Sequence, residues 1–142
     1  MSAQSLGFVL LGEGDTSRAV RYDKFVEALF KVDTHIQMVN HAALGVCGEA
    51  GELADCLKKH IHYGKPVNFD NLVEELGDLR FYLQAVQNIF GITEQHILQK
   101  NAEKLAVRYA GLMYSDDAAI ARADKLPVAA PSPSTCEKGK ES

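Results

Sequence analysis

Hydrophobic residues recur along this chain at alternating steps of three and four residues, the spacing of one face of an α-helix. The pattern predicts four main helices, over about 18–30, 34–62, 68–90 and 93–109. The longest has its apolar positions at Val39, Ala43, Val46, Ala50, Leu53, Leu57 and Ile61, and the next at Leu72, Leu76, Leu79, Leu83, Val86 and Phe90. Since no stretch shows the alternation of a strand, the predicted class is all-α, a bundle of four helices.

Glycine and proline separate the predicted helices. Gly64 and Pro66 interrupt the pattern after the second helix, and the short loop there makes the second and third helices antiparallel neighbours. Residues 1–17 are expected to be a flexible N-terminal segment, whose "LGEGDTS" lacks the G-K-[ST] ending of a phosphate-binding loop. The helical domain is expected over 18–114. Residues 115–142, which include "PVAAPSPSTCEKGKES", are expected to form a largely disordered C-terminal tail.

Two pairs of acidic residues interrupt the apolar pattern of the second and third predicted helices. Glu49 and Glu52 lie three residues apart in "GEAGEL", and Glu75 and Asp78 lie three apart in "EELGDL". Residues at this spacing share a helix face. Each pair borders the apolar positions of its helix, so the four carboxylates should converge at the edge of the contact between the two helices.

Such a cluster needs compensation, because like charges about 4 Å apart repel by roughly 4 kcal/mol at an effective dielectric constant near 20. Protonation, cationic side chains or bound cations can relieve the repulsion. Carboxylates without His or Cys are the ligands of Mg²⁺ or Mn²⁺. The spacing therefore favours a metal site, and the alternative is an acidic face exposed to solvent.

The amino-acid composition limits which partners the chain is expected to bind and in which cell compartment it is expected to act. The 142 residues fit one domain, and 15 Lys and Arg against 19 Asp and Glu give a net charge of −4. With no basic block, the chain is not expected to bind a nucleic-acid polymer, although a small anionic ligand fits. Three cysteines without a C-x-x-C pair, together with the lack of a signal peptide or a membrane-length apolar run, predict a cytoplasmic protein with no membrane partner.

The combination E-x-x-E, a gap of 22 residues and E-x-x-D resembles the signature of the all-α nucleoside triphosphate pyrophosphohydrolases. This superfamily includes MazG, the dimeric dUTPases and the dCTP pyrophosphatases. The resemblance runs from about His41 to Tyr109 and includes "GEAGEL", "HYGK", "EELGDLRFYL" and "NAEKLAVRY". The compact form looks most like the MazG-like proteins of phages and bacteria, and it is also similar to the MazZ-type phage members, which hydrolyse guanine nucleotides.

The resemblance implies that Glu49, Glu52, Glu75 and Asp78 are catalytic residues that bind Mg²⁺, with Mn²⁺ as a substitute. It implies cleavage of a (d)NTP, with (d)GTP as a candidate, into the monophosphate and pyrophosphate, and thereby control of a nucleotide pool. A base that orients the attacking water is expected among the four acids, with Glu52 as one candidate. Members of the family are homodimers or homotetramers, and broad apolar faces such as that at 22–30 agree with such an assembly. A phage-encoded member would act in the host cytoplasm.

Five further residues are candidates for binding the substrate. Lys104 and Arg108, with Asn101 as a weaker candidate, resemble the family's phosphate-facing residues, although long side chains at such positions also cover apolar surface. Lys59 follows Glu52 by two turns and is a candidate for the phosphate tail, or else it complements the dipole of the helix end. Tyr82 is expected either to stack on a base or touch a phosphate, or to belong to the edge of the core.

A function of a different class remains open at this point. A non-enzymatic helical oligomerisation or regulatory protein could use the acids as a groove for a basic partner. The position of the acids beside the apolar residues and the cationic face of the fourth helix favour the enzyme, because a partner-binding groove needs neither.

Overall fold

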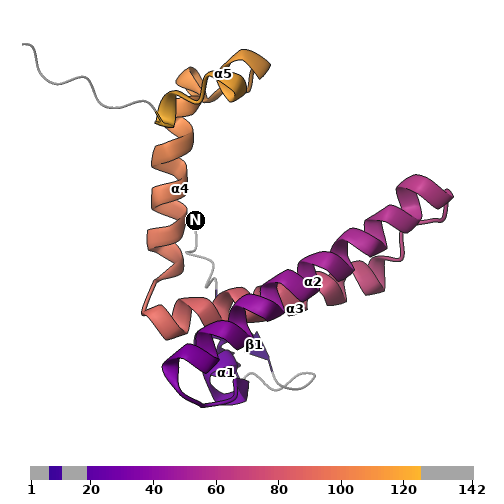
Figure 1. Cartoon of the computed structure of the whole chain (residues 1–142), viewed down its shortest axis with the longest axis vertical. Coiled ribbons are helices and arrows are strands. Elements are labelled where there is room, and N and C mark those ends of the chain that lie inside the picture. Colours follow the sequence, from indigo (N-terminus) through magenta and orange to yellow (C-terminus); the bar gives the residue numbers. More distant parts are fainter. Residues whose placement is uncertain (1–6, 11–18, 126–142) are drawn as a thin grey trace, which may run out of the picture. The chain divides into compact units, whose positions relative to one another are not determined.

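The computed structural model describes residues 7–10 and 19–125 of the chain, which divides into two units, Met1–Glu94 and Gln95–Ser142. The described residues contain five α-helices, which confirms the all-α class (Figure 1). They are α1 (Tyr22–Leu29), α2 (His35–Tyr63), α3 (Phe69–Phe90), α4 (Glu94–Arg108) and α5 (Asp116–Ala121). Because the bounds of α2 and α3 lie within one residue of the predicted ones, the hydrophobic pattern was sufficient to locate both long helices.

A small β-hairpin precedes α1. Strand β1 (Phe8–Leu10) pairs antiparallel with β2 (Ala19–Arg21), so that Val9 lies opposite Val20. The hydrophobic pattern gives no sign of this hairpin, because strands of three residues are too short for alternation to register. The rest of the predicted N-terminal segment, residues 1–6 and 11–17, lies outside the described residues.

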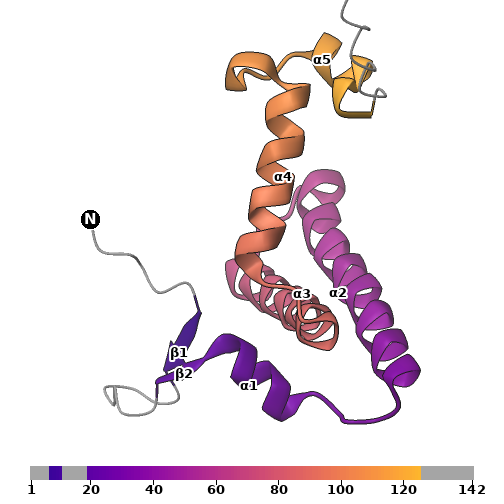
Figure 2. The same ribbon diagram turned by 90° about the vertical axis from the view of Figure 1, so that its left-hand side faces the viewer.

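The two long helices α2 and α3 run antiparallel and side by side, as predicted (Figures 1 and 2). Gly64 ends α2 in a left-handed conformation with φ of 62°, which glycine adopts without steric cost. The Asn68 side chain caps α3 by accepting a hydrogen bond from the Asn71 backbone N–H. Gly91 ends α3 in the same left-handed conformation. Gly64 and Asn68 thus limit the loop between the helices to residues 64–68, which is short enough to keep α2 and α3 adjacent and antiparallel.

The core of the first unit is small and lies where α1 packs on the helix pair. Val26 of α1, Ala42 of α2 and Ala85 of α3 are buried together, and Phe30 and Phe81 pack against them. The contact face is rotated from the predicted apolar positions, several of which are exposed: Ala43, Leu57, Ile61, Leu76, Leu83 and Phe90. Glu49 and Glu75, which border the contact between α2 and α3, are half-buried.

The second unit continues α4 into shorter elements, the 3₁₀ turns Ala110–Leu112 and Ala123–Lys125 flanking α5. Ser115 caps α5 by accepting a hydrogen bond from the Ala118 backbone N–H. Helical structure thus continues into the range predicted as a tail, and residues 126–142 lie outside the described residues. Among the residues described, none of the helices has the length and apolar character needed to cross a membrane.

Candidate metal centre

The two acid pairs converge between α2 and α3. Glu49 and Glu52 of α2 and Glu75 of α3 each offer a carboxylate oxygen, and these oxygens lie within 4.8 Å of one another. Asp78 is outside this trio, but its charge reaches Glu49. Glu49 and Glu75 are half-buried, whereas Glu52 and Asp78 are exposed. The arrangement combines two inner carboxylates with two that solvent reaches.

A close approach of the two helices one turn away fixes the register of this cluster. The ring of Tyr82 lies so near the α2 backbone that a Cβ atom at Gly45 would overlap with it. Glu49 follows Gly45 by one turn and Asp78 precedes Tyr82 by one turn, so antiparallel helices in this register bring Glu49 opposite Asp78. The ring also makes an edge contact with His41, with centroids 5.8 Å apart. Tyr82 is therefore part of the helix contact next to the acids.

The electrostatics of the cluster are those of an uncompensated site. Partial burial raises the pKa of Glu49, and the negative charges of Asp78, Glu52 and Glu75 raise it further. Within the described residues, no ion pair joins these four carboxylates to a Lys or Arg. An all-oxygen donor set with unneutralised charge is suited to a hard divalent cation, so the residues present fit Mg²⁺ or Mn²⁺.

Asn71 is a site residue that the sequence pattern did not single out. Its Nδ2 donates a hydrogen bond of 2.6 Å to Oε1 of Glu75, one turn further along α3. This bond holds the Glu75 carboxylate in place on α3. The spacing of four residues between an amide and a carboxylate was the signal that could have found it.

Two of the predicted substrate-binding residues have ion-pair partners within their own unit. Lys59 is exposed, and its Nζ lies 2.9 Å from Oδ2 of Asp55, whose pKa the hydrogen bonds from Lys58 and Lys59 lower to about 2. Arg108 binds Asp124 through two hydrogen bonds of 2.7 and 2.9 Å. Asn101 and Lys104 are exposed on α4 and, like Arg108, belong to the second unit. Of the two candidates in the first unit, Lys59 and Tyr82, it is Tyr82 that packs one turn from the acids.

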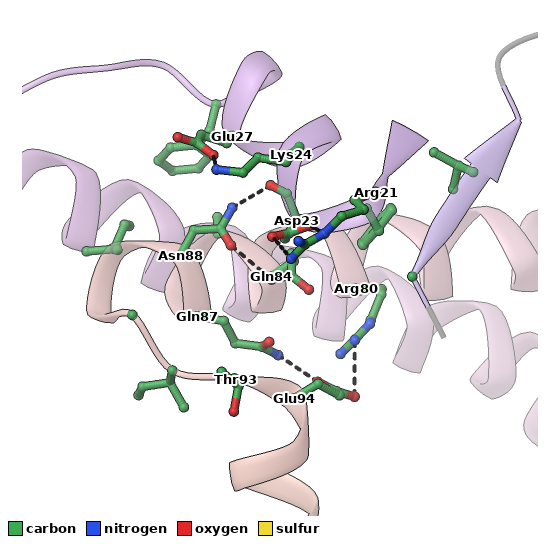
Figure 3. A pocket seen from close by; sticks show the side chains of 18 of the residues that line it. Arg21, Asp23, Lys24, Glu27, Arg80, Gln84, Gln87, Asn88, Thr93 and Glu94 are labelled. Carbon is green, nitrogen blue, oxygen red and sulfur yellow. Dashed lines mark hydrogen bonds and ion pairs between the residues drawn. The ribbon is translucent and has the colours of Figure 1, made fainter. Parts of the chain in front are cut away.

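A cavity of about 900 Å³ lies in the first unit against the other side of α3 (Figure 3). Its polar lining includes Arg80, Gln84, Gln87, Asn88 and Glu94 together with the charged residues Arg21, Asp23, Lys24 and Glu27. Its apolar lining includes Phe30, Val32, Met38, Ile89 and Ile92. Gly77 and Tyr22 also line it. Gly77, Arg80, Gln84 and Gln87 recur at steps of three and four residues, so they share a face of α3 that differs from the face of Glu75, Asp78 and Tyr82.

The part of the chain that contains the acid cluster matches a known protein family. Residues 37–112 match the family described as "MazG nucleotide pyrophosphohydrolase domain". "Gene 37 protein" of Mycobacterium phage L5 is 32% identical over 77 residues, which is 51% of this chain and 68% of the phage protein. No solved structure matches the chain. The family match contains both acid pairs, Asn71 and the close contact at Gly45 and Tyr82.

Proposed function

Because the chain belongs to the MazG nucleotide pyrophosphohydrolase domain family, we propose that it hydrolyses a (d)NTP to the monophosphate and pyrophosphate and thereby controls a nucleotide pool. The observation that carries the proposal is the convergence of Glu49, Glu52 and Glu75, with ligand oxygens within 4.8 Å of one another. The resemblance to the phage MazZ-type proteins makes (d)GTP the first candidate substrate.

The four acids would hold Mg²⁺, or Mn²⁺ in its place. When bound, the cation neutralises charge on the phosphates and makes a water molecule more acidic. Asn71 would keep the Glu75 carboxylate in one orientation while it binds the cation. Glu52 is exposed and is our candidate for accepting the proton of the attacking water. The bond that breaks joins the α and β phosphates.

The residues proposed to bind the phosphate tail differ in whether their side chains already form ion pairs within the chain. Lys104 has an exposed side chain and is the first candidate on α4, with Asn101 as a weaker one. Arg108 would have to exchange Asp124 for a phosphate, and Lys59 would have to leave Asp55. Tyr82 already packs against α2, which makes a role in positioning the acids better supported than base stacking.

A homodimer or homotetramer is part of the proposal. Large apolar side chains of the helix pair, such as Ile61, Phe69 and Val73, are exposed in one chain. A second copy of the chain would cover them. With no nucleic-acid polymer or membrane as a partner, the enzyme is expected to act on free nucleotides in the cytoplasm, which for a phage-encoded protein is that of the host.

The test is incubation of the purified protein with each dNTP and NTP in the presence of Mg²⁺, followed by ion-exchange chromatography of the products. We expect a nucleoside monophosphate and pyrophosphate from at least one nucleotide. Orthophosphate and a nucleoside diphosphate would contradict the proposed bond cleavage. Calorimetry that detects no uptake of Mg²⁺ or Mn²⁺, with or without triphosphate, would contradict the metal site.

A further inference from the structure

The second unit carries an exposed apolar element after α4, residues 110–125, here called the α5 hook (Figure 2). Four of its large apolar side chains are largely in solvent: Leu112 at 83%, Met113 at 75%, Tyr114 at 72% and Ile120 at 79% exposed. Single exposed apolar residues are ordinary on a protein surface, but such a concentration in one element is typical of a surface that another protein covers. Most of the hook lies beyond residues 37–112, which match the family.

Buried and specific contacts hold this hook in place on the end of α4. Arg108 donates hydrogen bonds of 2.7 and 2.9 Å to the two carboxylate oxygens of Asp124. The Asp124 side chain is 2% exposed and that of Arg108 is 16% exposed, so this bidentate pair is a specific tie rather than a loose surface contact. The rings of Tyr109 and Tyr114 also meet, with centroids 5.6 Å apart. The chain thus fixes the hook while leaving its apolar side chains in solvent.

The loop end of the α2–α3 pair, residues 53–74, is a second exposed apolar surface. Its exposed large apolar side chains are Leu57, Ile61, Tyr63, Phe69 and Val73. Lys58, Lys59 and Lys65 lie in the same stretch. Lys58 and Lys59 share the carboxylate of Asp55, whereas Lys65 forms no ion pair with any residue that the structure describes. The loop end therefore combines apolar surface with exposed positive charge.

The charges of the hook can pair with those of the loop end. The exposed charged residues of the hook are two acids at the start of α5 and two basic residues after it, Asp116, Asp117, Arg122 and Lys125. At the loop end the order is reversed, because the three lysines precede the exposed acids Asp70 and Glu74. Opposite orders allow the acids of α5 to meet the lysines while the basic residues of the hook meet the acids of α3. Such complementarity favours one partner and one orientation.

The reach of α4 favours a hook from a second copy over the hook of the same chain. The 15 residues of α4 extend about 22 Å, and the 22 residues of α3 extend about 33 Å, at 1.5 Å per residue. Since α4 follows the end of α3 that is far from the loop, an α4 folded back along α3 would end about 10 Å before the loop. A second copy has no such restriction, and the exchange of two hooks closes a dimer with two identical contacts.

We propose that the α5 hook of one copy docks on the loop end of the α2–α3 pair of a second copy, and that two copies exchange hooks reciprocally. The inference rests on the homo-oligomer of the proposed function and names the surface that covers Ile61 and Phe69 in it. The tie between Arg108 and Asp124 holds the hook in its docking position.

The first experiment mixes two variants that each lack one half of the contact. Ile61→Asp alters the loop end and Ile120→Asp alters the hook, and each alone should self-associate about tenfold or more weakly, because a charge is buried in the contact. An equal mixture should associate again, since the intact hook of the Ile61→Asp chain meets the intact loop end of the Ile120→Asp chain. Sedimentation velocity at matched total concentration measures this. The mixture should associate more weakly than the wild-type protein, because one contact of two is intact.

Two further variants control this experiment. Ile36→Asp, at a side chain 76% exposed on α2, should leave association unchanged. Met113→Asp alters the hook outside α5 and should behave as Ile120→Asp does, which excludes unfolding of α5 as the cause. A mixture that stays dissociated would overturn the exchange, since neither a contact within one chain nor a contact between two loop ends is restored by mixing. Wild-type association of both hook variants would also overturn it.

The second experiment tests the tie that holds the hook. Because the Asp124 side chain is buried, it is not part of the docking surface. Asp124→Asn should nevertheless weaken self-association several-fold, together with faster amide hydrogen exchange over residues 110–125. Association at the wild-type level would overturn the positioning role of the Arg108 and Asp124 pair.

This proposal and the proposed function fail in different ways. A protein whose mixed variants associate but which hydrolyses no nucleotide would support the hook contact and overturn the enzymatic function. A protein that hydrolyses a nucleotide but associates equally well with Ile120→Asp and Met113→Asp would support the function and overturn the hook contact.

Discussion

The two ends of the α2–α3 pair follow the same hydrophobic pattern but are buried to very different extents. At the end where α1 packs, Ala42 and Ala85 are buried against Val26. At the loop end, Ile61 is 70% exposed and Phe69 is 71% exposed. Among the described residues of that end, from 53 to 74, Cys56 alone is buried.

This difference suggests that the two ends of the helix pair have different roles, one in spacing the helices within a chain and the other in the proposed assembly. The covered end sets the distance between α2 and α3 within one chain, because small residues and the Gly45–Tyr82 contact bring the backbones together. The open end presents apolar surface that a second copy would cover. The acids lie between the two ends. Their geometry should therefore depend on the covered end, and assembly should depend on the open end.

The largest expected effect comes from removing one negative charge from the acid cluster, which lies between the two ends, without changing the packing. Glu49→Gln should reduce turnover about 1,000-fold or more, because the stabilisation of charge that a metal supplies in the transition state is worth several kcal/mol. The free energy of unfolding should stay the same or rise, since a repulsive neighbour of Asp78, Glu52 and Glu75 is removed. Single-turnover kinetics measure the first quantity and urea unfolding measures the second.

The control for this change is Glu103→Gln, which removes an exposed carboxylate from α4. It should alter neither turnover nor Mn²⁺ binding. If Glu49→Gln unfolded the protein, the acids would be structural parts of the helix contact, and the separation of the two tasks would be wrong.

The second effect tests the covered end through two glycines of α2. Gly45→Ala should destabilise the protein by about 1–3 kcal/mol, because the new Cβ overlaps with the Tyr82 ring and forces the helices apart. Gly48→Ala is the matched control, since among the described residues nothing outside the local turn of α2 lies within 4 Å of an added Cβ there. It should be neutral or stabilise by up to about 1 kcal/mol through helix propensity. Urea unfolding compares the two, and equal losses would contradict a special contact at Gly45.

The third effect tests the open end with a pair of similarly exposed isoleucines on the same helix. Ile61→Asp should weaken self-association about tenfold or more, because it buries a charge in the proposed interface. Ile36→Asp, at a side chain 76% exposed near the covered end, should leave association unchanged. Sedimentation velocity over a range of concentrations measures both. A wild-type protein that sediments as a monomer would contradict the assembly.

The sequence was sufficient for what depends on local pattern. The ends of α2 and α3 could be predicted from the hydrophobic periodicity and from Gly64 and Gly91. The three-residue spacing of the acids within each helix predicted that each pair shares a face. It could not show which side of each helix would face the other. That choice depends on the small residues Ala42 and Gly45, which a hydrophobic pattern weights less than Leu57 or Ile61 although they allow the closest approach.

Contacts between distant residues were likewise beyond the sequence. The resemblance made Arg108 a candidate phosphate ligand, but nothing in the pattern indicated that Asp124, 16 residues away, would bind it. The cavity wall combines Arg80 and Glu94 from different helices. Neither pairing has a fixed spacing, so each needs the tertiary structure.

The smallest expected effect is a pH dependence of the free energy of unfolding that arises from the acid cluster. The pKa of Glu49 is raised from its ordinary value of 4.5 in the folded protein, so the folded chain retains a proton where the unfolded chain has lost it. Without metal, the stability that this proton contributes is fully present below pH 4.5 and is lost as pH rises through the raised pKa. Urea unfolding with a chelator, from pH 4.5 to 7, should show this decline.

Two comparisons assign the decline to the acid cluster. Glu49→Gln should flatten it, and Mg²⁺ should reverse it at the upper end of the range, because the metal binds the deprotonated carboxylates. Asp124 provides an internal contrast, since the hydrogen bond from Arg108 lowers its pKa from 3.8 to about 2. Its contribution is present above pH 3.8 and is lost as pH falls towards 2, so the two groups act in opposite directions and in separate windows. A decline that persists in Glu49→Gln would mean that the charge repulsion lies elsewhere than in the contact between α2 and α3.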